Sequence, residues 1–276
     1  KNVYSRSFES APPPRNISTA SIFSKYLYFL IKSCYTSDME HHKNKKAFTL
    51  AEVLITLGII GVVAALTIPT LISKYQEKQT IVKLKKVYSI LQNAYTAAEA
   101  EHDKPRYWTN PDYTDDNNII IWNILTEHIT NKKICTKNCF PTYKNLKGQR
   151  LSLGGDIHDY MTIILPDGAV LSANFPWMSL YVGGDYFPVG PITVDLNGLK
   201  GPNVAGKDYF RFWLTHGKGI VPCGAQIYPD DDTWVTGMQS DNNGSCFTGW
   251  VIQQENMKYT KCKDYTKFTW SHPSCD

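Results

Sequence analysis

This chain of 276 residues has seven cysteines. Cys34 falls within the first 38 residues, and the other six, whose side chains are best suited to a defined chemistry, all follow residue 130. They are Cys135, Cys139, Cys223, Cys246, Cys262 and Cys275. An even set of cysteines favours disulfide bonds formed in an oxidising compartment. A structural zinc site is the alternative, but the sequence has no C-x-x-C pair, and its closest cysteines are Cys135 and Cys139.

The spacing of these cysteines allows many pairings. We expect Cys246 to pair with Cys262, because this bond would enclose a predicted strand at residues 247–253. Cys135 and Cys139 would then join locally, which leaves Cys223 with Cys275.

A second set of candidate residues lies in the loop at residues 195–208. Asp195, Asn197 and Asp208 bracket three glycines and a proline, and hard oxygen ligands on a glycine-bent loop are what calcium requires. The loop is not an EF-hand, because its twelfth position is not Glu. Calcium is the one cofactor that the sequence suggests. The alternative is a tight structural turn in which these side chains bond to the backbone.

The third candidate is Glu52, the one ionisable side chain in the 25 residues from 48 to 72. At about 1.5 Å per residue, this apolar run is long enough to cross a bilayer as a helix. An acidic residue at mid-membrane costs about 3 kcal/mol, so Glu52 is predicted to have a function and a partner. The alternative is that Glu52 merely lies at headgroup level near the start of the helix.

The sequence gives little support for an enzyme. The histidines that follow the apolar run are scattered, and no G-x-S-x-G, H-E-x-x-H or phosphate-binding loop occurs. Residues 48–276 carry 21 Lys and Arg against 22 Asp and Glu, because residues 1–47 hold eight of the 29 basic and three of the 25 acidic residues. This near-neutral balance does not indicate nucleic-acid binding, despite the net charge of +4.

The elements that would position these residues follow from the pattern of the chain. We expect residues 1–38 to be a non-native or disordered extension, since the first Met is Met39, with a genuine cytoplasmic extension as the alternative. Residues 39–47 form a basic leader, residues 48–72 a transmembrane helix half, and residues 73–103 an amphipathic half. One apolar stripe marks the amphipathic half: Ile81, Leu84, Tyr88, Leu91, Tyr95 and Ala98.

From residue 104 to residue 276 the composition predicts a β-rich globular domain. Pro166, Asp167 and Gly168 form a hairpin turn signal between two apolar runs. Further strands are expected at residues 192–196, 209–214, 225–228 and 247–253. The predicted fold class is α+β, with the long N-terminal helix packed on a disulfide-containing β-rich domain. A membrane-tethered coiled coil is the alternative for the helix, but its stripe is short for that.

Residues 45–54, KKAFTLAEVL, resemble the processing site of type IV prepilins and type II secretion pseudopilins. The resemblance combines a basic leader, a small residue before the cut, Phe48 at the new N-terminus, Glu52 as the fifth residue after the cut, and an apolar helix beyond. Most members of the family have Gly before the cut, where this chain has Ala47. The loop at residues 195–208 loosely resembles the calcium loop of major pseudopilins.

This resemblance implies a minor pilin-like structural subunit of a type IV pilus or a type II secretion pseudopilus. A prepilin peptidase would cut between Ala47 and Phe48, the new amine would be methylated, and Glu52 would face the amine of Phe48 in a neighbouring subunit. The chain would be a single-pass protein of the bacterial cytoplasmic membrane with its globular domain outside the cytoplasm. Its implied partners are other pilin or pseudopilin subunits, the peptidase, the inner-membrane assembly platform and membrane lipid.

Two alternatives remain for the same residues. A secretory signal peptide would be removed after the apolar run, but this run is long, contains Glu52 and is not followed by a clear A-x-A site. A membrane-anchored extracellular binding module would keep the helix and never form filaments.

Overall fold

The computed structural model describes residues 49–108, 115–137, 139, 141–151, 161–173, 175, 188–226 and 243–275, and at residues 115–117, 188 and 189 it describes the backbone alone. The chain divides into two compact units, Lys1–Val63 and Ala64–Asp276, and each is considered by itself. The predicted extension at residues 1–38 and the leader at residues 39–47 lie outside the described residues.

Among the described residues, two helices precede the strands and a third helix follows them. The helices are α2 (Leu50–His102), α3 (Asp115–Glu127) and α4 (Thr248–Gln254). The strands are β1 (Lys133–Ile134), β2 (Thr162–Ile164), β3 (Val170–Ala173), β4 (Pro188–Asp195), β5 (Tyr209–Thr215) and β6 (Ile220–Pro222). Short 3-10 turns are η1 (Pro105–Tyr107), η3 (Ser245–Phe247), η4 (Lys258–Lys261) and η5 (Tyr265–Lys267).

The strands form one antiparallel sheet in which the spatial order, β1-β2-β3-β4-β5-β6, is also the order along the chain. The predicted hairpin is confirmed, since β2 pairs with β3 and Thr162 lies opposite Ser172. Gly168 adopts a φ of +88° in the connecting turn, a backbone conformation that glycine reaches without steric cost.

The predicted strands at residues 192–196 and 209–214 are confirmed as β4 and β5. They pair in register, with Ile192 opposite Phe212, and both of these side chains are buried. With the long N-terminal helix and three disulfides, the sheet gives the α+β fold that the sequence predicted.

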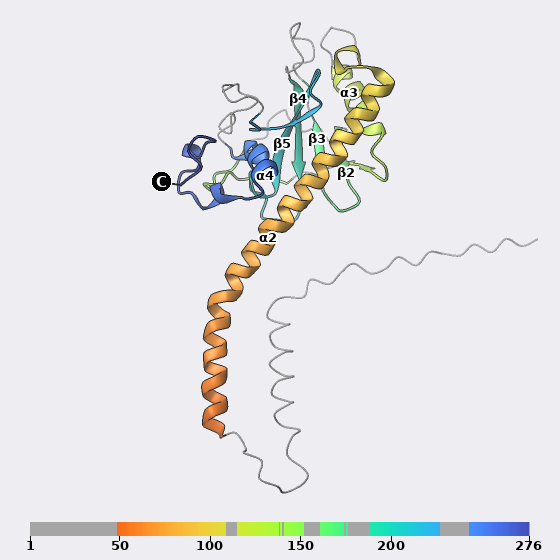
Figure 1. The fold of residues 1–276 in the computed structure, drawn as a ribbon. Coiled ribbons are helices and arrows are strands. Elements are labelled where there is room, and N and C mark those ends of the chain that lie inside the picture. The colour runs from red at the N-terminus through yellow and green to blue at the C-terminus, as the bar shows by residue number, and fades with distance from the viewer. Residues whose placement is uncertain are drawn as a thin grey trace, which may run out of the picture. The chain divides into compact units, whose positions relative to one another are not determined.

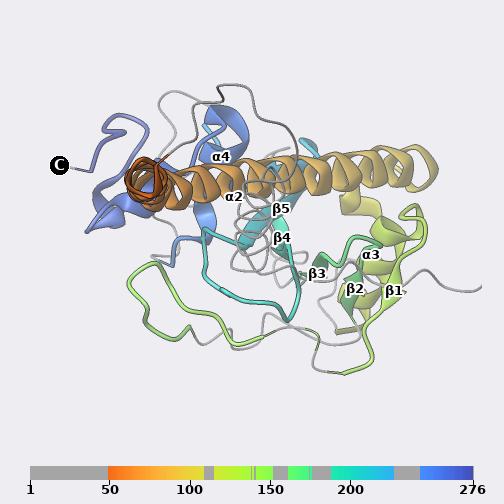
Figure 2. The same cartoon turned by 90° about the horizontal axis from the view of Figure 1, so that it is seen from below.

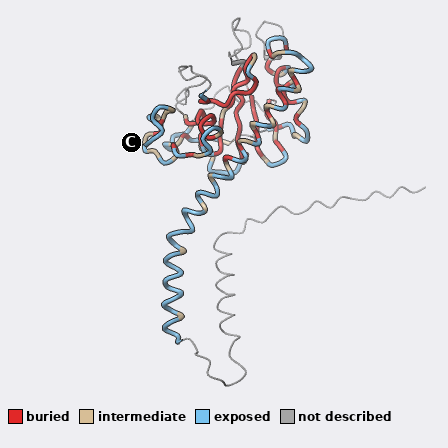
Figure 3. The backbone as a smooth tube through the Cα atoms, in the orientation of Figure 1, coloured by how far each residue is buried: buried red, intermediate tan, exposed pale blue. Residues whose placement is uncertain are grey.

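In the second unit, α2 packs against one face of the sheet (Figures 1 and 2). The predicted stripe is the packed side of the helix (Figure 3), and Tyr88 stacks on Phe212 with 5.8 Å between the ring centroids. Each fully buried leucine or isoleucine stabilises the fold by about 1.5–3 kcal/mol. The buried residues of α2 are Ile81, Leu84, Val87, Leu91, Ala94, Tyr95 and Ala98.

Polar contacts fix the position of the helix along the sheet. The side chain of Gln92 accepts a hydrogen bond of 3.1 Å from the backbone nitrogen of Ile220 in β6. Lys86 forms a 2.7 Å ion pair with Asp167 in the β2–β3 turn. Because these partners lie in two different hairpins, the helix cannot slide along the sheet without breaking both contacts.

The helix α3 was not predicted, because the composition from residue 104 onward was interpreted as that of a β-rich domain. It buries Ile121, Trp122 and Leu125 in the same core as α2. Its Asn118 accepts a hydrogen bond of 3.0 Å from the backbone nitrogen of Phe175.

The predicted strand at residues 247–253 is wrong, since this segment is the end of η3 followed by α4. Its buried residues, Thr248, Gly249, Trp250 and Val251, are consecutive and do not alternate as in a half-buried strand. Gly249 permits the packing, because a Cβ there would lie 2.2 Å from the backbone nitrogen of Ala225. Backbone-to-backbone approach of this kind leaves no trace in hydrophobic periodicity.

The predicted strand at residues 225–228 is also wrong where the structure describes it. Residues 225 and 226 lie outside the strands, and residues 227 and 228 fall outside the described residues. The edge strand is instead β6, Ile220–Pro222, and Gly224 then turns the chain with a φ of +74°. Pro222 cannot donate to a sheet ladder, which fits its place at the end of an edge strand.

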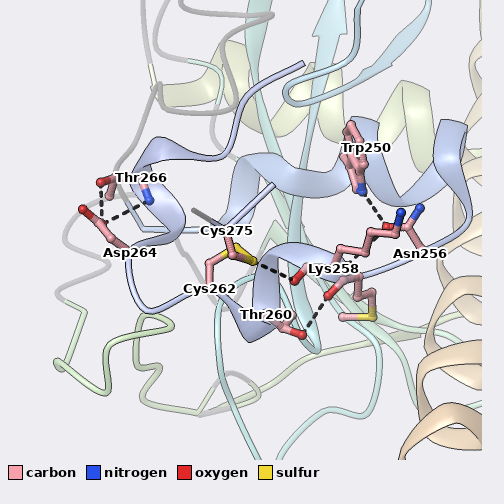
Figure 4. Close-up of a disulfide and its surroundings, with 9 residues drawn as sticks. Trp250, Asn256, Lys258, Thr260, Cys262, Asp264, Thr266 and Cys275 are labelled. Carbon is pink, nitrogen blue, oxygen red and sulfur yellow. Dashed lines mark hydrogen bonds between the residues drawn. A yellow bond between two sulfur atoms is a disulfide. The ribbon is translucent and has the colours of Figure 1, made fainter. Parts of the chain in front are cut away.

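The disulfides confirm one predicted pairing and correct two. Cys135 bonds to Cys139 as expected. The other bonds join Cys223 to Cys246 and Cys262 to Cys275, so the predicted pairings of Cys246 with Cys262 and of Cys223 with Cys275 are wrong. The first of these two bonds forms because η3 lies against the end of β6, which leaves 4.5 Å between the two Cα atoms. Figure 4 shows the second, beside Lys258 and Thr260. Because disulfide sulfurs are not thiolates, these bonds also exclude the cysteine zinc site.

Candidate processing and assembly site

The N-terminus of α2 is capped by two side chains that lie three residues apart, Thr49 and Glu52. The hydroxyl of Thr49 accepts a hydrogen bond of 3.3 Å from the backbone nitrogen of Glu52. In return, Glu52 Oε2 accepts hydrogen bonds from the backbone nitrogen and the hydroxyl of Thr49, at 2.8 and 2.9 Å. This reciprocal arrangement is a capping box, which satisfies backbone donors that the first turn of a helix leaves free.

The capping box places the carboxylate at the positive end of the helix dipole, where a negative charge is favoured. Of the residues predicted to take part in processing and assembly, Glu52 is described and is exposed. Ala47 and Phe48 lie outside the described residues, so their predicted roles stay predictions.

Beyond Glu52, the helix surface is apolar and uncovered (Figure 3). By length and composition, α2 could cross a membrane. A signal sequence near an N-terminus can have the same length and composition. Large apolar side chains up to residue 71 that are at least a third exposed are Leu50, Leu54, Ile55, Leu57, Ile59, Ile60, Val62, Val63, Leu66, Ile68 and Leu71. A surface of this kind requires lipid or other apolar helices around it.

The loop at residues 195–208 brings the three predicted calcium ligands together through hydrogen bonds. Asp195 is fully buried, and its Oδ1 accepts from the backbone nitrogens of Asn197 and Gly198 at 2.8 and 2.6 Å. Its Oδ2 accepts a hydrogen bond of 2.5 Å from the hydroxyl of Tyr143. These contacts are those of a tight structural turn anchored on a tyrosine from another part of the chain.

Asp208 closes the other side of the same loop. Its two oxygens accept hydrogen bonds of 2.6 Å from the backbone nitrogens of Asn203 and Val204, and Asn197 Nδ2 lies 3.5 Å from Oδ2. Burial raises the pKa of Asp195 to about 7, and the charge of Asp208 also raises it, while hydrogen bonds oppose the shift. Burial likewise raises the pKa of Asp208.

The donor set fits calcium in kind, because two neighbouring buried carboxylates gain from a cation. The buried Asn197 Oδ1 also has no hydrogen-bond partner within the described part of the chain. Against this, every carboxylate oxygen of Asp195 and Asp208 already accepts a donor from the protein. Lys83, Lys207 and Lys261 also line the cavity of about 550 Å³ that Asn197 and Asp208 border. Calcium binding at this loop therefore stays a prediction.

Two models of known protein families match the chain, one in its N-terminal helix region and one over most of the remainder. A model described as a family of unknown function (DUF6613) matches residues 70–266, most of the chain. The chain belongs to this family. A second model, the prokaryotic N-terminal methylation motif, matches residues 42–68. No curated protein and no solved structure matches the chain.

The match to the methylation motif, together with the long apolar helix, confirms the resemblance that the sequence predicted: this family member is a type IV prepilin-like protein. Proteins with this motif are structural subunits. The helix and the motif together support membrane anchoring of the chain.

Two contributors to these sites were missed from the sequence. Thr49 caps the helix, and the pattern Thr-x-x-Glu before an apolar run was a readable signal for this role. Tyr143 bonds to Asp195 across 52 positions of sequence, and no local pattern connects the two residues.

Proposed function

We propose that this chain is a structural subunit of a bacterial filament, either a minor pilin of a type IV pilus or a minor pseudopilin of a type II secretion system. A prepilin peptidase cuts between Ala47 and Phe48, and the new amine of Phe48 is methylated. The observation that carries this proposal is the exposed apolar start of α2, which lies within and just beyond a matched methylation motif at residues 42–68.

The apolar helix surface is buried in two successive environments. Before assembly it lies in the bilayer, and after assembly it packs against the same helix of neighbouring subunits. Leu50, Leu54 and Leu66 each leave more than half of their surface exposed in the single chain, at 79%, 61% and 72%. Burying one such side chain contributes about 1.5–3 kcal/mol, so a row of them is sufficient to drive assembly.

Glu52 selects the position of one subunit against the next. A charge inside an apolar helix bundle is tolerated when an opposite charge accompanies it, and the methylated amine of Phe48 in a neighbour supplies that charge. The hydrogen bonds from Thr49 fall on Oε2, and a carboxylate has about four acceptor positions, so capping leaves room for the amine.

The proposed orientation places the second unit outside the cytoplasm. Its three disulfides require an oxidising compartment, because cytoplasmic thiols are kept reduced. The proposed partners are other pilin or pseudopilin subunits, the prepilin peptidase, the inner-membrane assembly platform and membrane lipid.

Intact-mass measurement of the protein extracted from membranes tests the processing step. We expect a mature chain that begins at methylated Phe48. Ala47→Leu should leave the leader attached, because the peptidase site requires a small residue, and Ala65→Leu in the middle of the helix is the matched control that should be processed normally. A mature N-terminus near Ala65 would contradict the proposal and favour a signal peptide.

Filament assembly is tested separately. We expect the mature chain to be found in filaments sheared from the cell surface, or in envelope-bound pseudopili whose loss stops protein export. A correctly methylated chain that remains a dispersed membrane protein, and whose deletion affects neither pili nor export, would instead identify a membrane-anchored binding module.

A further inference from the structure

The C-terminal ends of α2 and α3 meet in the second unit (Figures 1 and 2). The helix α2 ends at His102, and Asp103 follows with a φ of +62°, which breaks the helix. The indole nitrogen of Trp108 donates a hydrogen bond of 2.8 Å to the carbonyl of Asp103, and Trp108 is itself buried against Tyr95. The end of α2 is therefore held in a fixed place by the core.

The end of α3 is fixed in the same way. Leu125, in the last turn of the helix, is fully buried, and Ile129, two residues beyond the end of the helix, is nearly so; together they anchor this end of the chain in the core. Glu127, the last residue of α3, and His128 directly after it project near the end of α2.

Four side chains with metal-binding atoms gather at this junction. Glu101, His102 and Glu127 are exposed, and one ligand atom from each lies within 4.8 Å of the others. Nε2 of His128 lies 3.8 Å from Glu101 Oε2. This nitrogen is buried and has no hydrogen-bond partner among the residues that the structure describes.

The electrostatics of the junction favour a cation. A helix carries a partial negative charge of about half an electron at its C-terminus, and two such ends converge here. The two glutamates add their full charges. The attraction is therefore toward a divalent ion, since a monovalent ion would leave most of this charge uncompensated.

We propose that Glu101, His102, Glu127 and His128 form a binding site for Zn²⁺ that joins the end of α2 to the end of α3. Imidazole nitrogen with carboxylate oxygen is a ligand set that zinc accepts, whereas calcium and magnesium prefer oxygen alone. Zinc holds four ligands tetrahedrally at about 2.0–2.2 Å, which places neighbouring ligand atoms roughly 3.3 Å apart.

This site is separate from the loop at residues 195–208 and from the processing site. Its existence does not depend on whether the chain forms filaments. Zinc bound here would link the two helix ends, where Nε2 of His128 lies 3.8 Å from Glu101 Oε2, and so stabilise the fold locally.

Titration of the purified, detergent-solubilised full chain with Zn²⁺, followed by calorimetry and by thermal unfolding, tests the proposal. We expect saturable binding of one Zn²⁺ per chain in the presence of excess Ca²⁺ and Mg²⁺, and a rise in melting temperature because zinc binds the folded state. His102→Ala and His128→Ala should each weaken binding by at least about tenfold.

The matched control is His272→Ala, which removes an exposed histidine far along the sequence and should leave zinc affinity unchanged. Thermal unfolding in EDTA reports whether each variant is folded. Glu127→Gln, at an exposed position, is a further variant that removes a carboxylate ligand without disturbing the core. Absence of saturable binding by the folded wild-type chain would overturn the proposal. Zinc binding by the His102→Ala, His128→Ala double variant with the affinity of the wild type would overturn it as well.

Discussion

The side chains of Thr49 and Glu52 cap the helix by bonding to each other, with Thr49 Oγ1 lying 2.9 Å from Glu52 Oε2. The same carboxylate is the one charge in an apolar run of 25 residues. Capping alone therefore offers an account of Glu52 that requires no neighbouring subunit. The two roles differ in what they require, because a cap needs an acceptor oxygen whereas an assembly contact needs a negative charge.

Glu52→Gln separates these roles. Glutamine serves equally in a capping box but carries no charge, so the helix should insert normally while filament incorporation falls. The expected fall is at least about tenfold, since a buried charge left without its partner costs roughly 3 kcal/mol or more. Thr49→Ala is the reciprocal change: it removes about 1 kcal/mol of capping and should leave incorporation intact. Normal incorporation of Glu52→Gln, measured in filament preparations beside Glu99→Gln as a control, would show that Glu52 is only a cap.

Asp195 predicts a pH dependence of stability in the second unit. Burial raises its folded pKa to about 7, well above its ordinary value of 3.8, so the folded state binds the proton more tightly than the unfolded state. Its contribution to stability is therefore complete below about pH 4 and is lost as the pH rises through about 7. Between pH 5 and pH 8 the free energy of unfolding should fall by roughly 2–3 kcal/mol from this group.

Asp195→Asn should remove that fall, which denaturant unfolding at several pH values measures. Asp264→Asn is the control. Hydrogen bonds from Thr266 and Lys147 lower the pKa of Asp264 to about 2, so its contribution changes only as the pH falls toward that value. Figure 4 shows Asp264 with Thr266. A wild type and an Asp195→Asn variant with parallel pH profiles would contradict the assignment.

Calcium binding by Asp195, Asn197 and Asp208 is tested by the same melting measurement. If the loop binds calcium, millimolar Ca²⁺ should raise the melting temperature, and Asp195→Asn or Asp208→Asn should abolish the rise. The rise should be larger at pH 8 than at pH 5, because calcium and protons compete for the carboxylates. A melting curve indifferent to both calcium and chelator at pH 8 would identify the loop as a structural turn.

The disulfide connectivity is tested by peptide mapping of the non-reduced protein. We expect one linked pair of peptides containing Cys223 and Cys246 and another containing Cys262 and Cys275. Replacing both Cys223 and Cys246 by Ala should cost roughly 3 kcal/mol of stability by loop-closure arguments, and replacing Cys262 and Cys275, which are 13 positions apart, should cost slightly less. A peptide joining Cys246 to Cys262 would support the connectivity predicted from the sequence instead.

The hairpin at Gly168 and the stripe from Ile81 to Ala98 could be read directly from the sequence, since each rests on interactions between residues close in the chain. The segment at residues 247–253 was misread as a strand because a short apolar run fits a strand and a buried helix equally well. The close packing of Gly249 against the backbone of Ala225 favours the helix, and no local sequence pattern predicts this approach.

The sequence by itself determined the apolar anchor, the methylation motif, the charge of Glu52 and the even set of cysteines, because these depend on residue type and local spacing. The tertiary structure alone decided that Cys246 meets Cys223, that Tyr143 bonds to Asp195, and that Glu101 approaches His128. The physical reason is common to all three. Each contact joins segments that become neighbours only after the sheet and the helices have packed, and the burial that drives packing is not specific to any pair of residues.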